Sequence, residues 1–274
     1  SLTIWDVPHA VYFHENQLCY PWNATDQDIQ LKRDNHYSWI NFTTALVADR
    51  CLFNSNYHMN AFLEALPKFL KQFPDNLSSK VNIIRQKSEV LHLGLELNKL
   101  DRNTNDVPVI LWNHRWEYDK GGKEFYEALR QVSDLDWKLV LAGERFSKIP
   151  TAFDRMRNEF PDRIIHDGFT DKETYHRLLA QSDILPVTTN QDFFGGSVIE
   201  AVYAGVYAIL PNRLAFPEHE AGSYYSTFED LVRQLRNSIE DFTALPDHSK
   251  NVEKYKWENC IDLYDSTLEN VVRT

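Results

Sequence analysis

From residue 109 to residue 210 the chain alternates short apolar runs with segments whose apolar residues recur at helical spacing. Such alternation is typical of parallel sheets whose strands are joined by right-handed helical crossovers. The expected strands cover residues 109–112, 137–142, 164–165, 183–187 and 206–210. The expected helices cover residues 122–132, 151–160, 172–180 and a short segment after the glycines at 195 and 196. The pattern predicts the α/β class, with a Rossmann-like sheet in this half.

The segment 97–107 is polar and rich in turn formers, so we place a domain boundary there. The expected division is a first domain at 1–103, a second at 104–250 and a last helix at 251–274. The first domain offers apolar runs for three strands, where a complete Rossmann-like domain has about six. We therefore expect an incomplete N-terminal domain, with an earlier part of the chain missing. Residues 67–89 are polar, and the next strand is expected at residues 90–93.

Composition excludes several classes of protein. The formal charge of −11 argues against a generally basic nucleic-acid binder, although a local basic patch stays possible. No apolar run approaches the ~20 residues that a membrane-spanning helix needs, and no secretory leader is visible. The three cysteines are scattered and fit a reducing compartment. We expect a cytoplasmic protein that does not span a membrane, with no catalytic metal; the oligomeric state is not set by the sequence.

The glycines Gly195 and Gly196 lie between an expected strand and an expected helix. The first turn of a helix has unpaired N–H groups and a partial positive charge, and glycine lets a phosphate approach that backbone. Asp192 precedes the glycines and Glu200 follows eight residues after Asp192, so the two carboxylates lie two turns or so apart. A phosphate site flanked by two carboxylates suggests a sugar nucleotide. Alternatively, Asp192 is only an N-cap and Glu200 a solvated helix residue, since such turns occur in every doubly wound sheet.

Two cations follow the expected strand 109–112. Arg115 and Lys120 lie five residues apart on a loop that leads into a helix. A guanidinium grips phosphate oxygens in a fork and an ammonium adds a compact charge, so together they could neutralise a leaving diphosphate. The alternative is a solvated charged loop. The position at the carboxyl end of a parallel strand, where ligands of such sheets bind, favours the functional interpretation.

A third cluster of polar residues lies in the first domain. His14, Glu15 and Asn16 follow directly after the expected strand 10–13, and Asn54 and Ser55 follow the expected strand 51–53. His14 could donate to a hydroxyl of the sugar or of the acceptor, with Glu15 and Asn16 positioning it. Five basic residues between 68 and 87 could touch nucleic-acid phosphates, but a solvated face is the favoured interpretation; they are Lys68, Lys71, Lys80, Arg85 and Lys87.

The motif with Asp192 and Glu200 resembles the Glu-x7-Glu signature of retaining glycosyltransferases of the GT-B fold, which has two Rossmann-like domains. Arg115 and Lys120 resemble the Arg-x4-Lys pair of the same enzymes. A closer resemblance, to the glycosyltransferase-like family that includes the tRNA-queuosine α-mannosyltransferase, covers most of residues 8–220. It rests on the segments Tyr12-Phe13-His14-Glu15-Asn16-Gln17-Leu18 with Tyr20-Pro21, Phe53-Asn54-Ser55, His114-Arg115-Trp116-Glu117 with Asp119-Lys120, Phe193-Phe194-Gly195 and Glu200-Ala201-Val202-Tyr203.

The resemblance implies a metal-independent reaction in which GDP-mannose is the donor and a queuosine hydroxyl of tRNA the acceptor. It implies that Glu200 holds the donor ribose and that the first acidic position, here Asp192, contacts the donor sugar. The expected donor-binding residues are Arg115, Lys120, Phe194, Gly195, Gly196 and Glu200. The expected catalytic residues are His14, Arg115, Lys120 and Asp192, and the expected acceptor-side residues are His14, Glu15, Asn16, Asn54 and Ser55.

Two other functions stay open at this point. A sugar-nucleotide epimerase or hydrolase on the same fold would convert its substrate without an acceptor. A non-catalytic module that binds a nucleotide sugar or RNA would show binding without turnover. The short first domain and the aspartate at position 192 favour the module.

Overall fold

The computed structural model describes residues 7–20, 35–75, 77–144 and 151–273. The chain divides into two compact units, one formed by Ser1–Gly94 with Trp257–Thr274 and the other by Leu95–Lys256. This division differs from the expected boundaries at 103/104 and 250/251. The polar segment after Gly94 belongs to the second unit, because the amide of Leu95 donates to the Tyr255 carbonyl at 2.8 Å and Arg102 donates to the Ser182 carbonyl at 2.7 Å.

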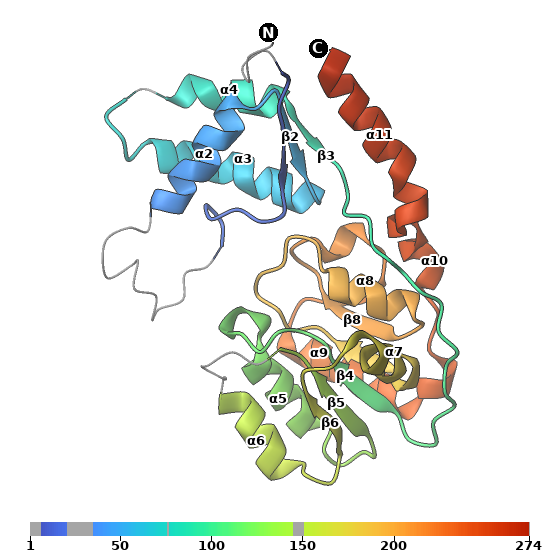
Figure 1. Ribbon diagram of the computed structural model, residues 1–274. Coiled ribbons are helices and arrows are strands. Elements are labelled where there is room, and N and C mark those ends of the chain that lie inside the picture. The colour runs from blue at the N-terminus through green and yellow to red at the C-terminus, as the bar shows by residue number, and fades with distance from the viewer. Residues whose placement is uncertain (1–6, 21–34, 76, 145–150, 274) are drawn as a thin grey trace. The chain divides into compact units, whose positions relative to one another are not determined.

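The first unit is built on a parallel sheet in the order β1 (Ala10–Phe13), β2 (Arg50–Phe53) and β3 (Ser88–Val90). The connecting helices are α2 (His36–Val47), α3 (Asn56–Leu70) and α4 (Ser78–Gln86). Every crossover steps in the same direction, so the helices cover one face of the sheet (Figure 1). The rings of Phe13, Phe53 and Phe62 pack 5.1–5.3 Å apart beneath them.

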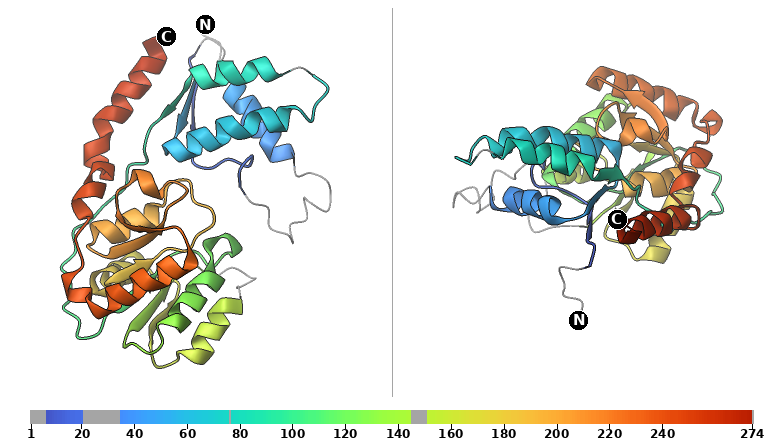
Figure 2. Two further views of the ribbon diagram at one scale, coloured as in Figure 1. Left: turned by 180° about the vertical axis from the view of Figure 1, so that it is seen from behind. Right: turned by 90° about the horizontal axis from the view of Figure 1, so that it is seen from above.

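The last helix, α11 (Trp257–Arg273), returns to the first unit and covers the other face of this sheet (Figures 1 and 2). Tyr12 points to that face because side chains alternate along a strand and Phe13 points to the other. The rings of Tyr12 and Tyr264 stack at 6.4 Å, and the Tyr264 hydroxyl donates to the His92 carbonyl at 2.8 Å. The Trp257 ring lies against the backbone of Gly94.

The second unit contains a six-stranded parallel sheet in the order β6-β5-β4-β7-β8-β9. The strands are β4 (Val109–Trp112), β5 (Lys138–Ala142), β6 (Ile164–Gly168), β7 (Ile184–Pro186), β8 (Tyr207–Pro211) and β9 (Gly222–Tyr225). The expected α/β class with parallel sheets is confirmed.

Helices cover both faces of the sheet in the second unit. The helices α5 (Gly122–Gln131), α6 (Thr151–Glu159) and α9 (Phe228–Glu240) pack with one another and close the main core. Right-handed crossovers put α7 (Lys172–Gln181) and α8 (Gly196–Tyr203) on the other face, where α10 (Ser249–Val252) joins α8. Short 3-10 helices complete the unit: η2 (Tyr118–Lys120), η3 (Phe216–Glu218), η4 (Phe242–Ala244) and η5 (Glu253–Tyr255).

The elements differ from the sequence-based expectations in three places. The polar segment 67–89 contains helices that the sequence did not predict, since α3 continues through Pro67 and α4 follows. Both helices are held by a few buried apolar residues among polar ones, such as Leu70 and Ile84. The strand expected at 90–93 is β3, which ends at Val90. β9 was missed because Gly222-Ser223-Tyr224-Tyr225 contains no aliphatic run.

Candidate active site

The order of the strands in the second unit reverses between β4 and β7. Chain segments leave neighbouring strands in opposite directions at such a switch point, and ligands of open parallel sheets bind in the crevice outside the carboxyl ends there. Residues 113–121 follow β4 and residues 187–195 follow β7. All the donor-site residues expected in the second unit lie on these two loops or in α8.

The two loops are bound to each other by buried hydrogen bonds. The amide of Asn190 donates to the Asp119 carbonyl at 2.7 Å, and the Thr188 hydroxyl donates to the Gly121 carbonyl at 3.0 Å. Gly121 has a φ of +70° and lies so close to Thr188 that an added Cβ would be 2.0 Å from its carbonyl oxygen. Only glycine fits this approach, so the β4 loop is fixed against the β7 loop.

Lys120 lies at the centre of these loops and is buried. Its Nζ donates to the Gln191 carbonyl at 2.9 Å and lies 3.1 Å from Asp119 Oδ2 and 3.7 Å from Asp192 Oδ2. Removing an ammonium from water is costly unless nearby carboxylates compensate the lost hydration. Asp119 and Asp192 provide that compensation for Lys120. The alternative interpretation of Lys120 as a solvated charge is therefore ruled out by its burial.

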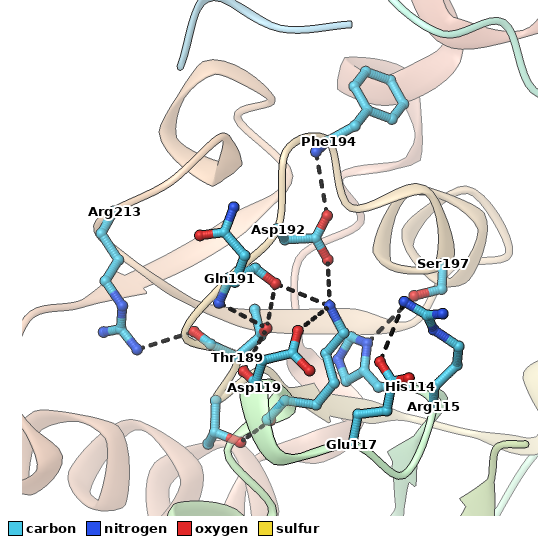
Figure 3. A network of polar contacts seen from close by, with 12 residues as sticks. His114, Arg115, Glu117, Asp119, Thr189, Gln191, Asp192, Phe194, Ser197 and Arg213 are labelled. Atoms are coloured by element: carbon cyan, nitrogen blue, oxygen red, sulfur yellow. Dashed lines mark hydrogen bonds and ion pairs between the residues drawn. The ribbon is translucent and has the colours of Figure 1, made fainter. Parts of the chain in front are cut away.

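Arg115 differs from Lys120 in exposure. Its side chain is 50% exposed, and its guanidinium lies 3.3 Å from Glu117 Oε2 (Figure 3). A surface ion pair of this kind is weak. The guanidinium is therefore able to leave Glu117 for a stronger anion such as a phosphate.

The glycine turn begins α8 as the sequence predicts. Gly195 is the N-cap residue, has a φ of +82° and makes no side-chain cap, and Gly196 begins the helix. Asp192 does not cap α8; its Oδ1 accepts a hydrogen bond from the Phe194 amide at 3.2 Å. The Phe194 ring is buried against His219 and Tyr255 and points away from Asp192 (Figure 3). Any donor contact of Phe194 would therefore come from its backbone.

Glu200 lies one turn further along α8 and lines a cavity of about 300 Å³. The other residues of this cavity include Glu96, Leu97, Lys172 and Tyr175. The Tyr175 hydroxyl donates to Glu200 Oε2 at 3.4 Å and accepts from Asn113 Nδ2 at 3.1 Å. Burial raises the pKa of the Glu200 carboxyl, although Tyr175 and Lys172 act in the other direction. Glu200 is therefore not a solvated helix residue.

Among the predicted donor groups, Glu200 lines the cavity beside Lys172 and Tyr175, whereas Lys120 is bonded between the β4 and β7 loops. The β4 loop is also bonded to α8. Ser197 and Glu200 are three residues apart and share a face of this helix. Asn113 Nδ2 donates to the Ser197 carbonyl at 2.7 Å and to the Tyr175 hydroxyl, which donates to Glu200, so Asn113 and Tyr175 link the β4 loop to Glu200.

His114 belongs to a segment that carries the family resemblance but was not among the predicted site residues. It is buried, its Nδ1 lies 3.4 Å from Ser197 Oγ (Figure 3), and no partner is recorded for Nε2 within the described residues. Burial and then the charge of Lys120 lower the pKa of His114 to about 4, so the ring is neutral near pH 7. Its position directly before Arg115 was the available signal.

In the first unit, most of the predicted acceptor-side residues hold the structure of the loops. Ser55 caps α3 by accepting from the His58 amide at 2.9 Å, and Asn54 donates to the His14 carbonyl at 2.9 Å. Asn16 is buried and accepts from the Cys19 amide at 3.1 Å. His14 and Glu15 are exposed at the carboxyl end of β1. Their roles toward an acceptor stay predictions.

Lys87 is not available to a phosphate in the described structure, because its Nζ donates to the Leu46 carbonyl at 2.8 Å and to the Ala48 carbonyl at the end of α2.

No group of three or more His, Cys, Asp or Glu side chains able to hold a metal occurs among the described residues. None of the described helices is long and apolar enough to cross a membrane. Pro21, part of the resemblance, lies outside the described residues.

Comparison with known proteins gives the chain a family. The model of the tRNA-queuosine alpha-mannosyltransferase N-terminal family matches residues 1–95, and the model of the glycosyl transferases group 1 family matches residues 97–256. A tRNA-queuosine alpha-mannosyltransferase of Drosophila melanogaster is 31% identical over 246 residues. That match covers 83% of this chain and 63% of the relative, so the chain spans less than two thirds of its length.

Solved structures show the same fold at low sequence identity. Sucrose-phosphate synthase from Thermosynechococcus elongatus superimposes with a TM-score of 0.69 at 16% identity, over 97% of this chain and 68% of that one. Anabaena Alr3699/HepE in complex with UDP and glucose gives 0.66 at 14% identity, over 96% and 72%. The expected GT-B fold is confirmed. With 160 of its residues, 97–256, matched by one family model, the chain belongs to the glycosyl transferases group 1 family.

Proposed function

We propose that this chain is a retaining glycosyltransferase that moves mannose from GDP-mannose to the queuosine nucleoside of tRNA. One observation carries the proposal. The buried Lys120, the half-exposed Arg115 and the glycine turn that begins α8 all lie at the switch point of the sheet in the domain matched by the glycosyl transferases group 1 family. The queuosine part rests on the match of residues 1–95 and on the Drosophila melanogaster relative.

The donor diphosphate would lie against the first turn of α8. Gly196 leaves room there, since a Cβ added to it would make only ordinary contact with Leu95 at 3.7 Å. Lys120 would keep its ion pair with Asp119 and exchange its longer contact with Asp192 for a phosphate oxygen, and Arg115 would leave Glu117. Cations and helix amides help most when the departing diphosphate gains charge, so they stabilise the transition state more than the ground state.

The nucleoside would occupy the cavity beside Glu200. An ionised carboxylate accepts hydrogen bonds from two vicinal ribose hydroxyls. Glu200 is preorganised for this by the Tyr175 hydroxyl, which Asn113 holds in turn. The roughly 300 Å³ of this cavity is at the lower end of ligand pockets in general. It suits one nucleoside better than a whole sugar nucleotide.

The sugar would then lie toward Asp192 and the β7 loop. Retaining transfer with departure and attack on one face needs no side-chain nucleophile, and we assign none. Asp192 would bind a sugar hydroxyl, and His14 would serve the donor sugar or the acceptor.

Free cysteines at positions 19, 51 and 260 support a reducing compartment, and we propose the cytoplasm, where tRNA is available.

The test is mass spectrometry of nucleosides from queuosine-containing tRNA after incubation with GDP-mannose. We expect a gain of one hexose on queuosine, and the Drosophila melanogaster relative serves as the positive control. No gain with this chain, while the relative is active, contradicts the acceptor assignment. Release of free mannose without tRNA would indicate a hydrolase, and GDP binding without any turnover would indicate a non-catalytic module.

A further inference from the structure

His219 is completely buried and lies between two polar groups of known chemistry. Its Nε2 is 2.6 Å from the Phe194 carbonyl oxygen, and its Nδ1 is 2.8 Å from the Tyr255 hydroxyl. A carbonyl only accepts, so Nε2 carries a proton. In the neutral ring Nδ1 is then an acceptor and the Tyr255 hydroxyl donates to it. The network therefore assigns a single tautomer.

The carbonyl that His219 holds belongs to the turn that starts α8. Phe194 precedes Gly195, whose φ of +82° is outside the range that other residues adopt readily. An added Cβ on Gly195 would lie 2.8 Å from the Phe216 ring, and the Phe194 amide is held by Asp192. The turn is thus fixed at three points: the Phe194 amide, the Phe194 carbonyl and Gly195. His219 fixes the carbonyl by donating a hydrogen bond to it.

Tyr255 connects this turn to the place where the chain passes between the two units. The chain crosses after Gly94 and again after Lys256. Both crossings lie next to Tyr255, because its carbonyl accepts from the Leu95 amide at 2.8 Å and Leu95 pairs with Lys256 as a β-bridge. The rings of Phe194, His219 and Tyr255 pack pairwise at 5.2 Å and near right angles. Rotation of one ring is therefore blocked by the other two.

We propose that Tyr255 and His219 are a positioning pair, which holds the glycine turn of α8 and links it to the junction of Gly94–Leu95 and Lys256–Trp257. The inference rests on the proposed function, since the turn matters because the donor diphosphate would bind there. Neither residue touches the donor. The pair sets the direction of the amides that do, so its loss affects donor affinity before it affects turnover.

The first measurement needs no ligand. Amide hydrogen exchange of the unliganded chain is compared for Tyr255→Phe, His219→Leu and Tyr126→Phe. Tyr126 is the matched control because its hydroxyl donates to Glu159 and so joins α5 to α6, which cover the opposite face of the sheet from α8. In Tyr255→Phe and His219→Leu we expect faster amide exchange at residues 194–199 and also at residues 95–97. In the Tyr126→Phe control we expect the exchange rates of both segments to stay unchanged. An effect confined to the turn, or none at either place, overturns the link.

The second measurement is GDP affinity by calorimetry in the same variants, together with the KM and kcat for GDP-mannose. We expect the Kd and KM to rise about tenfold in Tyr255→Phe and His219→Leu, with a smaller change in kcat. His219→Gln, whose amide can still donate to the Phe194 carbonyl, should restore most of the affinity. Wild-type affinity in Tyr255→Phe contradicts the positioning role. Absence of GDP binding by the wild type contradicts the proposed function instead, and the exchange data still decide on the pair.

Discussion

Glu200 lies where burial and function oppose each other. Burial raises the pKa of its carboxyl, yet binding two ribose hydroxyls requires the ionised form. We expect Glu200→Ala to weaken GDP binding by about 1.5–3 kcal/mol, since charge-assisted hydrogen bonds are lost. Because the pKa is raised, GDP affinity of the wild type should fall on acidification at a higher pH than an ordinary glutamate would cause.

Titration calorimetry with GDP across a pH series checks both statements about Glu200. Glu200→Gln is the matched variant, because its amide keeps the size of the side chain and removes the titration. This variant should bind GDP weakly and without the acidic fall. A fall of equal size in Glu200→Gln assigns the pH dependence to another group, and unchanged affinity in Glu200→Ala refutes the ribose contact.

Arg115 and Lys120 are expected to separate catalysis from stability. Both Arg115→Ala and Lys120→Ala should lower turnover more than GDP affinity, because the diphosphate gains charge as the glycosidic bond breaks. Lys120→Ala should also destabilise the fold by about 3–5 kcal/mol, since it leaves Asp119 buried without its cation. Arg115 is half exposed, so its removal should leave the melting temperature unchanged.

Thermal melts and single-turnover kinetics of the two variants provide the measurement. Lys120→Arg is a useful third variant, because it keeps the charge but cannot reproduce the compact geometry of the ammonium. If Lys120→Ala melts like the wild type, the ion pair with Asp119 has little structural importance. If either alanine variant turns over as fast as the wild type, that cation does not assist the leaving group.

At the scale of elements, the start of α8 distinguishes two neighbouring glycines. Gly195→Ala must place an L residue at a φ of +82° beside the Phe216 ring, so we expect a loss of about 1–3 kcal/mol of stability together with weaker GDP binding. Gly196→Ala meets only ordinary contact with Leu95 inside a helix and should keep or slightly raise the melting temperature. It should nevertheless weaken GDP binding, if the phosphate needs the bare backbone.

Chemical denaturation and GDP calorimetry of this pair decide between a structural and a binding role. Wild-type GDP affinity in Gly196→Ala contradicts close approach of the diphosphate to this residue. Unchanged stability in Gly195→Ala means that the turn relaxes to another conformation, and the hydrogen bond from His219 to the Phe194 carbonyl would then be expected to lengthen.

The elements show why part of this architecture was predictable. The strands β4, β5, β7 and β8 are buried on both faces, so each is a continuous apolar run that sequence alone identifies. β9 pairs at the edge of the sheet and contains glycine, serine and two tyrosines, with no such run. α4 buries little more than Val81 and Ile84, which is too little for a helical pattern to stand out.

The positions of the candidate site residues at the ends of strands were predictable, and their pairings were not. Loops at the ends of parallel strands indicated where Arg115, Lys120 and Glu200 would be needed. That Lys120 is held by Asp119 and Asp192 depends on two loops from separate parts of the chain. His219 and Tyr255 carry no motif, and their roles follow only from distances in the folded chain.

At the scale of the whole molecule, the first unit takes its last helix from the far end of the chain. Leu52 and Leu91 are only 2% and 1% exposed to solvent. Leu52 is paired with Tyr12 on the face of the sheet that α11 covers. We therefore expect that a chain ending at Lys256 loses the protection of β1, β2 and β3 from hydrogen exchange. Exposing one large apolar side chain costs about 1.5–3 kcal/mol. A loss of about 1.4 kcal/mol raises the equilibrium population of the open, exchanging state tenfold.

Amides of these three strands should therefore exchange at least about tenfold faster in the shortened chain, while those of β4, β7 and β8 change little. GDP affinity should survive, since the proposed nucleoside contacts belong to Leu95–Lys256. Leu263→Ser in the intact chain is the control, because Leu263 is 53% exposed on α11 and its loss should leave β1–β3 protected. Full protection of β1–β3 without α11 contradicts the covering role of this helix. Loss of GDP binding would mean instead that the junction after Lys256 is needed to hold Tyr255, and with it the turn at Gly195.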